Sequence, residues 1–225
     1  MGNYRLNPKI FHTRYIVLSE LRDETISKLK EITATDKTKI LVDFGCGDMP
    51  YREVIAPMVG EYIGVDLAMN PKATHHIDFD SKTTLPDNFA DIILSNQVLE
   101  HVDTPSGYLQ EAFRLLKPGG HLLLSTHGYW FYHPTPNDYW RWTSAGLRKI
   151  MEAEGFKINS FHGILGLTAS GLQLFQDGIV LKLHKFFIPF FAFIMQLLIR
   201  ILNKVNSQAQ RNRDGAVYVV VAKKV

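Results

Sequence analysis

The chain has 225 residues, a formal net charge of +3 and 21% charged residues, which suits a single α/β domain with a sizeable buried core. No stretch rich in Lys and Arg is interleaved with stacking aromatic residues, so nucleic acid is not expected as a substrate or partner. The single cysteine, Cys46, excludes an intrachain disulfide, and residues 1–18 lack the continuous apolar core of a secretory signal. These features favour a reducing, cytoplasmic setting.

Apolar runs and helical periodicity alternate along the chain. Helices are predicted over about 19–32, 50–58, 105–116 and 143–153. Strands are predicted over about 39–44, 62–66, 90–96, 121–126, 157–163 and 216–222. Strands that alternate with helices predict a doubly wound α/β fold, with a mostly parallel sheet covered on both faces. We expect one domain over residues 1–225, with a helical extension at 1–38 and an apolar, basic helical insertion at 167–214.

The first functional signal lies between residues 40 and 67. An apolar run leads into Gly45 and Gly47, and a second apolar run ends on Asp66. Glycine at these two positions lets the backbone turn sharply and lets a ligand sit against main-chain N–H groups. A carboxylate at the tip of the neighbouring strand can accept both hydroxyls of a ribose. The pattern therefore predicts a site for a nucleoside cofactor.

The residues that follow make this pattern more specific. They include the strings HIDFD at 76–80, LPDNFADIILSN at 85–96, LEHV at 99–102 and LLKPGG at 115–120. In this order and spacing, residues 39–156 resemble a class I S-adenosylmethionine-dependent methyltransferase of the type 11-like subgroup. The resemblance implies a Rossmann-like, seven-stranded sheet whose last strand enters antiparallel next to the sixth. It also implies S-adenosylmethionine as the cofactor.

The resemblance assigns roles to residues near the glycine turn. Asp43 would lie near the amino-acid end of the cofactor, and Asp66 would hold the ribose beside the backbone of Gly45 and Gly47. Leu67 would flank the adenine. The family's third turn glycine is absent, because the string MPY follows at 49–51.

Three further positions complete the predicted cofactor site. Asp78 matches the family acid that accepts from the adenine amino group, with the Phe79 N–H beside it. The loop is ambiguous by one residue, so Asp80 stays a competing acid. Asn96, at the tip of the fourth strand, matches the position that lines the reacting end.

Methyl transfer to a hydroxyl needs in-line alignment, exclusion of water and removal of a proton. His101 and His127 both follow strands that end at the carboxyl edge of the sheet, so either could serve as the base. The predicted catalytic set is Glu100, His101 and His133. The alternative for each histidine is a capping or supporting role.

Residues 128–143 form the most distinctive stretch, with seven aromatic side chains among sixteen residues. Aromatic faces with a few polar groups suit a sugar ring, a quinone-like ring or a flat headgroup, although part of them could pack in the core. The string PNDYWRWT at 136–143 resembles a methyltransferase subgroup associated with surface-glycan and lipid-linked sugar chemistry. The residues predicted to bind the acceptor are His127, Tyr132, Asp138, Tyr139, Arg141 and Trp142.

The string QVLEH at 97–101 resembles the Glu-x-x-Glu-His ligand set of metal-dependent relatives, which include small-RNA ribose methyltransferases and a quinone-pathway O-methyltransferase. Here Gln97 replaces the first glutamate. A neutral amide binds a hard dication less well than a carboxylate, so no metal site is predicted. A weak site formed by Glu100, His101 and His133 stays open.

Residues 179–202 are strongly apolar, and residues 178–213 contain six Lys or Arg and no Asp or Glu. The uncharged core at 186–199 contains Pro189 and is too short to span a bilayer. We expect an interfacial helix pair, whose aromatic residues enter the acyl boundary while its cations meet anionic headgroups. A substrate lid or a homodimer helix buried in protein is the alternative.

These features predict an enzyme that is peripheral to the cytoplasmic membrane face and methylates a hydroxyl on a glycan or a lipid-linked, amphiphilic acceptor. A soluble small-molecule methyltransferase with a dimer or lid insertion is one alternative. A non-catalytic scaffold on the same fold is another. The intact Asp43 and Asp66 argue against the scaffold, because a scaffold need not keep a ribose carboxylate.

Overall fold

In the computed structural model, which describes residues 3–78, 80–135 and 137–225, seven strands form one sheet in the order β3-β2-β1-β4-β5-β7-β6. The strands are β1 Ile40–Phe44, β2 Glu61–Leu67, β3 His75–Ile77, β4 Ala90–Asn96, β5 Leu116–His127, β6 Phe156–Ile164 and β7 Val217–Lys224. The pairs from β3 to β5 are parallel, whereas β7 is antiparallel to both β5 and β6. The predicted α/β class and the antiparallel last strand beside the sixth are confirmed.

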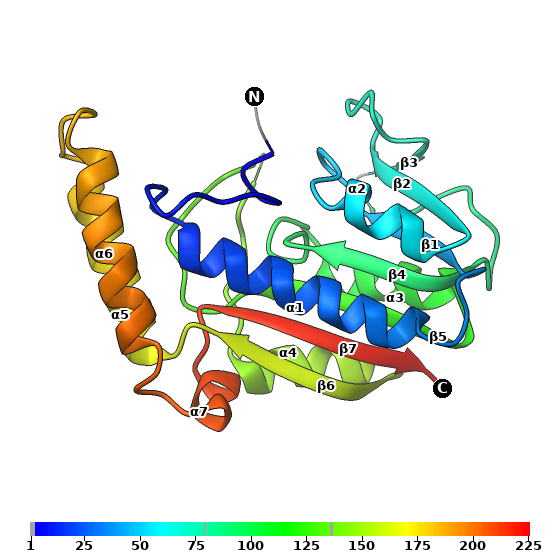
Figure 1. Ribbon diagram of the computed structural model, residues 1–225. Coiled ribbons are helices and arrows are strands. Elements are labelled where there is room, and N and C mark those ends of the chain that lie inside the picture. The colour runs from blue at the N-terminus through cyan, green and yellow to red at the C-terminus, as the bar shows by residue number, and fades with distance from the viewer. Residues whose placement is uncertain (1–2, 79, 136) are drawn as a thin grey trace.

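Helices cover both faces of this sheet (Figure 1). They are α1 Tyr15–Thr33, α2 Arg52–Ile55, the 3-10 helix η1 Ala56–Met58, α3 Pro105–Leu115, α4 Ser144–Ala153, α5 Leu167–Val180, α6 Ile188–Leu202 and α7 Gln208–Arg213. The predicted helix over 50–58 is shorter and divides into α2 and η1. Helix α1 begins four residues before its predicted start.

Two apolar cores lie on opposite faces of the sheet, because successive strand residues point to opposite sides. Val42 packs with Leu109 of α3 and Leu147 of α4 on one face. Leu41 packs with Leu21 and Leu29 of α1 on the other. The sheet is therefore covered by packed apolar side chains on both faces.

Two local devices fix the elements near that edge. The Tyr108 hydroxyl of α3 lies 2.8 Å from both the Phe44 carbonyl and Ser95 Oγ, which ties α3 to the ends of β1 and β4. Thr143 caps α4 by accepting from the Gly146 N–H at 3.0 Å. The cap therefore fixes where the aromatic segment between β5 and α4 ends.

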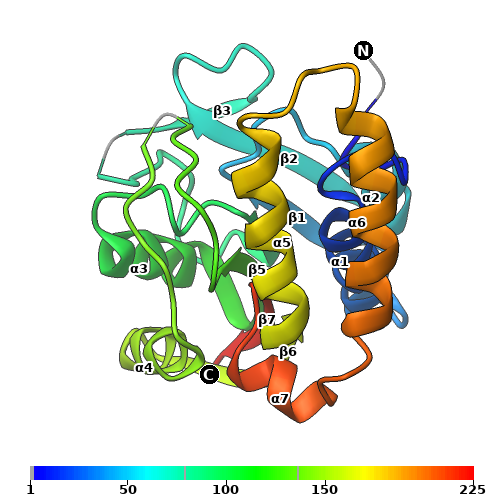
Figure 2. The ribbon, with the colours of Figure 1, turned by 90° about the vertical axis from the view of Figure 1, so that its left-hand side faces the viewer.

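Helices α5 and α6 lie side by side at one end of the molecule, between β6 and β7 in the chain (Figures 1 and 2). The predicted apolar helix pair is therefore present at the expected place. Among the helices of the described residues, none has both the length and the apolar character needed to cross a membrane.

Candidate active site

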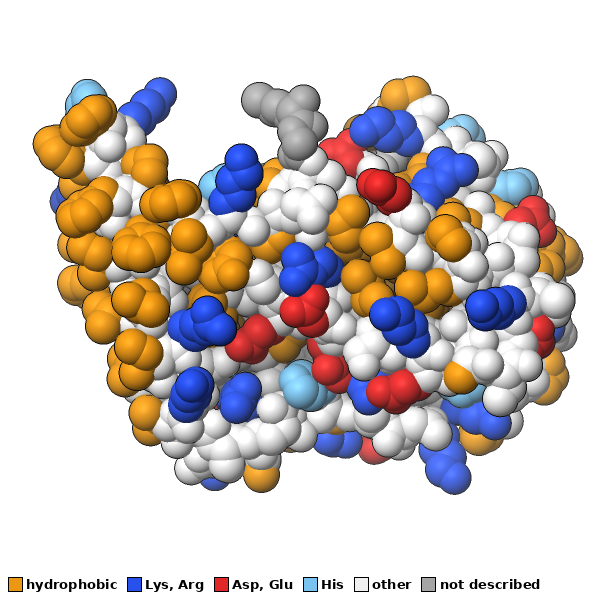
Figure 3. All heavy atoms as spheres, viewed as in Figure 1, with side chains coloured by type: hydrophobic (Ala, Val, Ile, Leu, Met, Phe, Trp, Pro, Cys, Tyr) orange, Lys and Arg blue, Asp and Glu red, His pale blue; other side chains and the backbone are white. Residues whose placement is uncertain are grey.

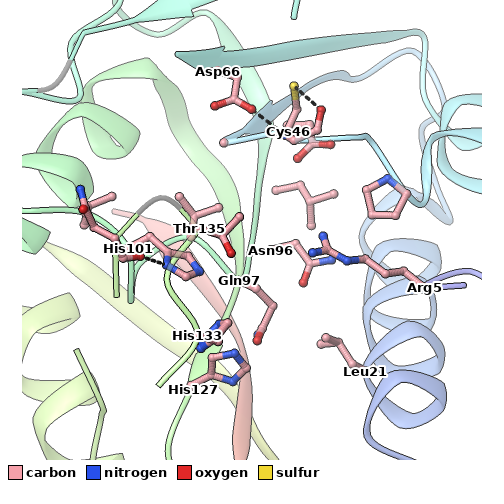
Figure 4. Close-up of a pocket in the computed structure, with 18 of the residues that line it drawn as sticks. Arg5, Leu21, Cys46, Asp66, Asn96, Gln97, His101, His127, His133 and Thr135 are labelled. Carbon is pink, nitrogen blue, oxygen red and sulfur yellow. Dashed lines mark hydrogen bonds between the residues drawn. The ribbon is translucent and has the colours of Figure 1, made fainter. Parts of the chain in front are cut away.

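A cavity of about 610 Å³ lies at the sheet edge where β1, β2, β4 and β5 end. Its wall combines the glycine turn after β1, these strand ends, the segment after β5 and part of the N-terminal region. Figure 4 shows a labelled part of the lining. The predicted residues that line the cavity are Asp43, Gly45, Gly47, Asp66, Leu67, Asp78, Asn96, His101, His127, His133 and Tyr139. Ligands of open α/β sheets bind at this edge.

The glycine turn requires glycine for two different reasons. Gly45 has a φ of 80°, and a Cβ there would lie 2.6 Å from Val98 Cγ2. At Gly47 the reason is the backbone conformation alone, because its φ is 50° and a Cβ there would meet no heavy atom within 4 Å. The N–H groups of Gly45 and Cys46 donate to the Val65 carbonyl at 2.8 and 3.0 Å, which draws the turn towards β2. The front of the turn thus presents bare backbone to the cavity.

Asp66 lies beside this turn at the end of β2 (Figure 4). Its Oδ2 accepts from the Gly47 N–H at 2.8 Å and from Asn70 Nδ2 at 2.7 Å, and its Oδ1 accepts from the Leu67 N–H at 2.8 Å. These donors hold the carboxylate at the cavity wall. A carboxylate has about four lone-pair positions and these donors occupy three, so one ribose hydroxyl can donate to the fourth, and a second hydroxyl has to displace one of the present donors.

The structure does not decide which of the two predicted acids after β3 contacts the adenine. Asp78 and Asp80 both line the cavity. Asp78 Oδ1 also accepts from the Lys82 N–H at 2.8 Å, which closes a tight turn. Phe79, whose N–H was predicted to join them, lies outside the described residues.

Asp43 is buried at the end of β1, where the Tyr62 hydroxyl donates to its Oδ2. Burial raises its pKa to about 7, because the cost of desolvating the charge exceeds the gain from that hydrogen bond; the nearby Asp66 charge raises it further. A cationic ligand would stabilise the ionised form of this buried carboxyl and so lower its pKa.

The tip of β4 carries an unusual backbone conformation. Gln97 has a φ of 59°, a backbone angle that residues other than glycine seldom adopt. Its N–H donates to the Ser125 carbonyl at 3.0 Å, and the Ser125 hydroxyl donates to Asn96 Oδ1. Both Asn96 and Gln97 line the cavity. Such strain is often found at functional sites.

Glu100 and His127 form a buried pair beside the cavity. Glu100 Oε1 lies 3.3 Å from His127 Nε2, and Glu100 Oε2 accepts from Thr126 Oγ1 at 2.8 Å. His127 is in the cavity wall, whereas Glu100 is not among the described lining residues. Burial raises the pKa of Glu100 to about 7 and lowers that of His127 well below its usual value.

The other two predicted histidines flank this pair. His133 packs edge-on against His127 and His101, with ring centroids 4.7 and 5.0 Å apart. Its Nδ1 lies 3.2 Å from Asp138 Oδ2, and His101 Nδ1 lies 2.5 Å from the Asn137 carbonyl. The three histidines that the sequence singled out therefore meet at one place (Figure 4).

Within the aromatic segment, part of the predicted acceptor-binding set lies away from the cavity. Tyr132, Asp138, Arg141 and Trp142 are not among the described residues that line the cavity. Asp138 instead accepts from Arg141 Nη1 at 2.6 Å and from the His133 N–H at 2.8 Å. These contacts lower the pKa of Asp138 in spite of its partial burial. The predicted role of these four residues in binding the acceptor stays a prediction.

Several lining residues were missed. Trp130 and Phe131 line the cavity, although no sequence pattern separates them from their aromatic neighbours. Tyr4, Arg5 and Arg14 reach it from the N-terminal region. Nothing in the local sequence of residues 3–14 signals this, because the segment is held by distant partners.

Two groups of side chains bring ligand-type atoms within 4.8 Å of one another: Glu100, His127 and His133, and His101, His133 and Asp138. The ligands of one divalent ion lie roughly 3 Å apart, so either group would have to contract around an ion. In the second group, Asp138 already pairs with Arg141. Gln97 directs its Nε2 towards Ser125 Oγ at 3.1 Å.

The fold and the cavity together define a class I, Rossmann-like cofactor-binding protein of the methyltransferase type. The absence of a side chain at Gly47, the carboxylate of Asp66 and the buried acid Asp43 suit the close approach, the ribose and the ammonium group of S-adenosylmethionine. The cavity is large enough for this ligand, since cofactor sites span about 300–1,000 Å³.

Comparison with known families supports this classification as a methyltransferase. Residues 17–160 match the family model described as a methyltransferase domain. The chain belongs to this family, and S-adenosylmethionine is its cofactor, as the resemblance implied.

Curated relatives match in part. A probable S-adenosylmethionine-dependent methyltransferase of Mycolicibacterium smegmatis is 27% identical over 142 residues, which cover 55% of each chain. The ubiquinone biosynthesis O-methyltransferase of Cereibacter sphaeroides is 35% identical over 99 residues, which cover 38% of this chain and 40% of the relative. The chain thus matches only about half the length of such relatives.

Solved structures support the fold. The [4+2]-cyclase SpnF has a TM-score of 0.58 at 19% identity and matches over 90% of this chain and 80% of its own. Phosphoethanolamine N-methyltransferase 2 of Haemonchus contortus has a TM-score of 0.58 at 16% identity, over 90% of this chain and 53% of its own. Because one neighbour is named a cyclase, the fold alone does not fix the reaction.

Proposed function

We propose that this protein transfers the methyl group of S-adenosylmethionine to a hydroxyl of an amphiphilic acceptor, such as a lipid-linked glycan, at a membrane surface. The proposal of membrane contact rests on the helix pair α5–α6, which buries amide side chains against the rest of the protein and exposes apolar side chains on its outer face. The cavity described above supports the methyl-transfer part.

Within the cavity, Asp66 would hold the ribose, Leu67 would flank the adenine, and Asp78 or Asp80 would accept from the adenine amino group. Asp43 would pair with the ammonium group. The bound cofactor supplies a methyl group that its positively charged sulfur activates. The protein then has to align the acceptor hydroxyl, exclude water and take up one proton.

The inner seam of the helix pair combines small and apolar side chains with three buried amides, Gln173, Gln176 and Gln196. Gln196 of α6 is fully buried, and its Nε2, which carries two N–H donors, lies within hydrogen-bond distance of three acceptors, Thr13 O, Gln173 Oε1 and Gln176 Oε1, at 3.0, 3.1 and 2.9 Å. Its Oε1 accepts from the Ile16 N–H at 2.9 Å. A satisfied polar network of this kind fixes how the pair sits on the N-terminal segment.

The outer face has the opposite character. Apolar side chains gather over this end of the molecule (Figure 3). Phe186 and Phe190 are 79% and 68% exposed. Other exposed apolar residues of the pair are Leu174, Phe175, Ile179, Leu181, Phe187, Phe193, Ile194, Leu197, Leu198 and Ile201. An apolar face of this extent marks contact with a membrane or another apolar partner.

Charge favours the membrane over a second protein copy. Residues 178–213 carry six cations and no acid, and of these cations Arg213 pairs with Asp214 just beyond the segment. Two identical copies that meet face to face would bring like charges together, whereas anionic lipid headgroups would attract them. We therefore propose that residues 167–214 form an insertion that docks on anionic lipid.

The helix pair also adjoins the proposed acceptor side of the cavity. Arg14 pairs with Asp177 of α5, and its guanidinium lies 5.2 Å from the Trp130 ring and 4.5 Å from the Phe131 ring. Both aromatic residues line the cavity. An acceptor with a lipid tail would then have its headgroup near the histidines while the tail stays in the bilayer.

Two assays test the proposal. Cosedimentation with phosphatidylglycerol vesicles should show binding that weakens with salt, and Phe186→Asp with Phe190→Asp should lower the affinity by at least about tenfold. Met69→Asp, an exposed apolar residue outside the helix pair, is the matched control. Transfer of a labelled methyl group to an organic-soluble product should follow when membrane lipid extract is supplied. Salt-independent dimerisation without vesicle binding would favour the soluble alternative.

A further inference from the structure

Arg14 lies where the cavity, the aromatic segment and the helix pair meet. It is the N-cap residue of α1, and it lines the cavity. Its Nη1 donates to Asp177 Oδ1 of α5, and its guanidinium lies over the rings of Trp130 and Phe131, which line the same cavity. Only 24% of the Arg14 side chain is exposed. An ion pair and two aromatic rings therefore restrict where this guanidinium can point.

The backbone on both sides of this arginine is also anchored to the helix pair. The Thr13 carbonyl lies 3.0, 2.7 and 3.0 Å from the amide nitrogens of Gln173, Gln176 and Gln196. The Ile16 N–H donates to Gln196 Oε1 at 2.9 Å. Because main chain and side chain are both held by protein contacts, the arginine is preorganised, and a ligand that binds it need not order it.

Part of the Arg14 guanidinium has no protein partner. Across residues 3–78, 80–135 and 137–225, its hydrogen bonds are made by Nη1, to Asp177 and to the Thr13 carbonyl at 3.3 Å. The N–H groups of Nε and Nη2 are thus left for water or a ligand. They form one edge of the guanidinium, where two parallel donors can bind both oxygens of a phosphate or carboxylate. Arg5 also lines the cavity, but within the same ranges no side-chain hydrogen bond or ion pair fixes its direction.

The place of Arg14 along the sheet favours the acceptor over the cofactor. The strand order runs β3-β2-β1-β4-β5, and Trp130 and Phe131 follow β5. The predicted cofactor acids Asp43 and Asp66 lie near the ends of β1 and β2, on the other side of β4. An anionic group of the acceptor would be repelled by those carboxylates and attracted by Arg14.

We propose that Arg14 recognises a phosphate group of the acceptor, at the point where the headgroup joins the apolar tail. This inference rests on the function proposed above and names the anionic part of the same acceptor. With the acceptor hydroxyl near the histidines and its tail at α5–α6, the linking group lies between them, beside Arg14. A phosphate is the oxoanion that commonly joins a polar headgroup to a lipid tail. Arg14 is thus a specificity residue and takes no part in transferring the methyl group or the proton.

Calorimetric titration with a matched pair of amphiphiles tests this role. Decyl phosphate and decyl glucoside share one tail, and only the first carries an anion. In protein saturated with S-adenosylhomocysteine, Arg14→Gln should lower the affinity for decyl phosphate by at least about tenfold and leave that for decyl glucoside unchanged. Lys9→Gln removes an exposed cation of the same segment outside the described cavity lining and is the matched control. Unchanged decyl phosphate affinity in Arg14→Gln, or equal loss for both amphiphiles, would overturn the proposal.

Further arms separate folding, the source of the phosphate and the cofactor. Arg14→Lys serves if the glutamine variant does not fold, and it should bind decyl phosphate at least about threefold more weakly, because an ammonium lacks two parallel donors. Inorganic phosphate should bind more weakly than decyl phosphate. Equal binding of the two, still dependent on Arg14, would support phosphate recognition and count against the lipid tail of the proposed function.

The affinity for S-adenosylhomocysteine distinguishes the two proposals. It should stay within about twofold in Arg14→Gln, whereas a loss of about tenfold would assign Arg14 to the cofactor carboxylate and overturn its role with the acceptor. Failure of the wild type to bind S-adenosylhomocysteine would instead overturn the proposed function. The titration of the ligand-free protein with decyl phosphate stands apart from that result.

Discussion

The affinity for the cofactor product should depend on pH through Asp43. Burial raises the pKa of this carboxyl to about 7, far above the usual value of about 3.9. At lower pH the free site therefore holds a proton on Asp43. If the ammonium group of S-adenosylhomocysteine pairs with the ionised carboxylate, binding must release that proton.

The size of the effect follows from the ionised fraction of Asp43. A group with a pKa of 7 is about 90% ionised at pH 8, about 10% at pH 6 and about 1% at pH 5. The affinity should hence fall about ninefold between pH 8 and pH 6 and about tenfold more by pH 5, a loss of roughly 2.6 kcal/mol in total. Above pH 8 the affinity should level off.

Calorimetry in two buffers of different ionisation enthalpy measures both the affinity and the protons released. About one proton should leave per site at pH 5.5, and about none at pH 8.5. Asp43→Asn should bind weakly with a flat profile. 5′-Methylthioadenosine, which lacks the ammonium group, should show no such pH dependence in the wild type. A flat wild-type profile, or the same slope in Asp43→Asn, would show that Asp43 does not control the affinity.

Three further variants probe the structure. Gly45→Ala, at a φ of 80° with a valine 2.6 Å from the new Cβ, should lower the free energy of unfolding by at least about 1–2 kcal/mol in urea titration; an unchanged midpoint would contradict the strained turn. Gln196→Leu should cost about 2–4 kcal/mol by leaving buried partners unsatisfied, whereas Leu198→Gln on the outer face should be neutral; the reverse order would refute a polar inner seam. Arg141→Gln should slow methyl transfer yet keep cofactor affinity, and equal loss of both would place Arg141 with the cofactor.

The cofactor half of the site was predictable from sequence because its signals are local. Gly45, Gly47 and Asp66 follow buried strands, so their positions at the sheet edge depend only on the alternation of strands and helices. The continuous apolar run of β7 likewise marks a strand buried on both faces, whereas its antiparallel place beside β6 came from the family resemblance. The choice between Asp78 and Asp80 stayed open because a shift of one residue in this loop changes which carboxyl group faces the cofactor.

The acceptor half was less predictable because distant contacts orient it. Trp130 lines the cavity while Tyr132 is exposed, although both belong to one aromatic run without periodicity. Asp138 and Arg141 act on each other and on His133, a partnership that spacing alone does not reveal. Gln196 is an isolated polar residue in an apolar helix, so its sequence pattern suggests exposure where the structure buries it.

Calorimetric titration with S-adenosylhomocysteine tests most directly whether this cavity is the cofactor site. The wild type should bind one equivalent and should not respond to NAD. Asp66→Ala should bind at least about 100-fold more weakly, because two charge-assisted hydrogen bonds to the ribose are lost at about 1.5–3 kcal/mol each. A folded wild type that binds no S-adenosylhomocysteine, or an Asp66→Ala variant that binds it as tightly as the wild type, would contradict the account.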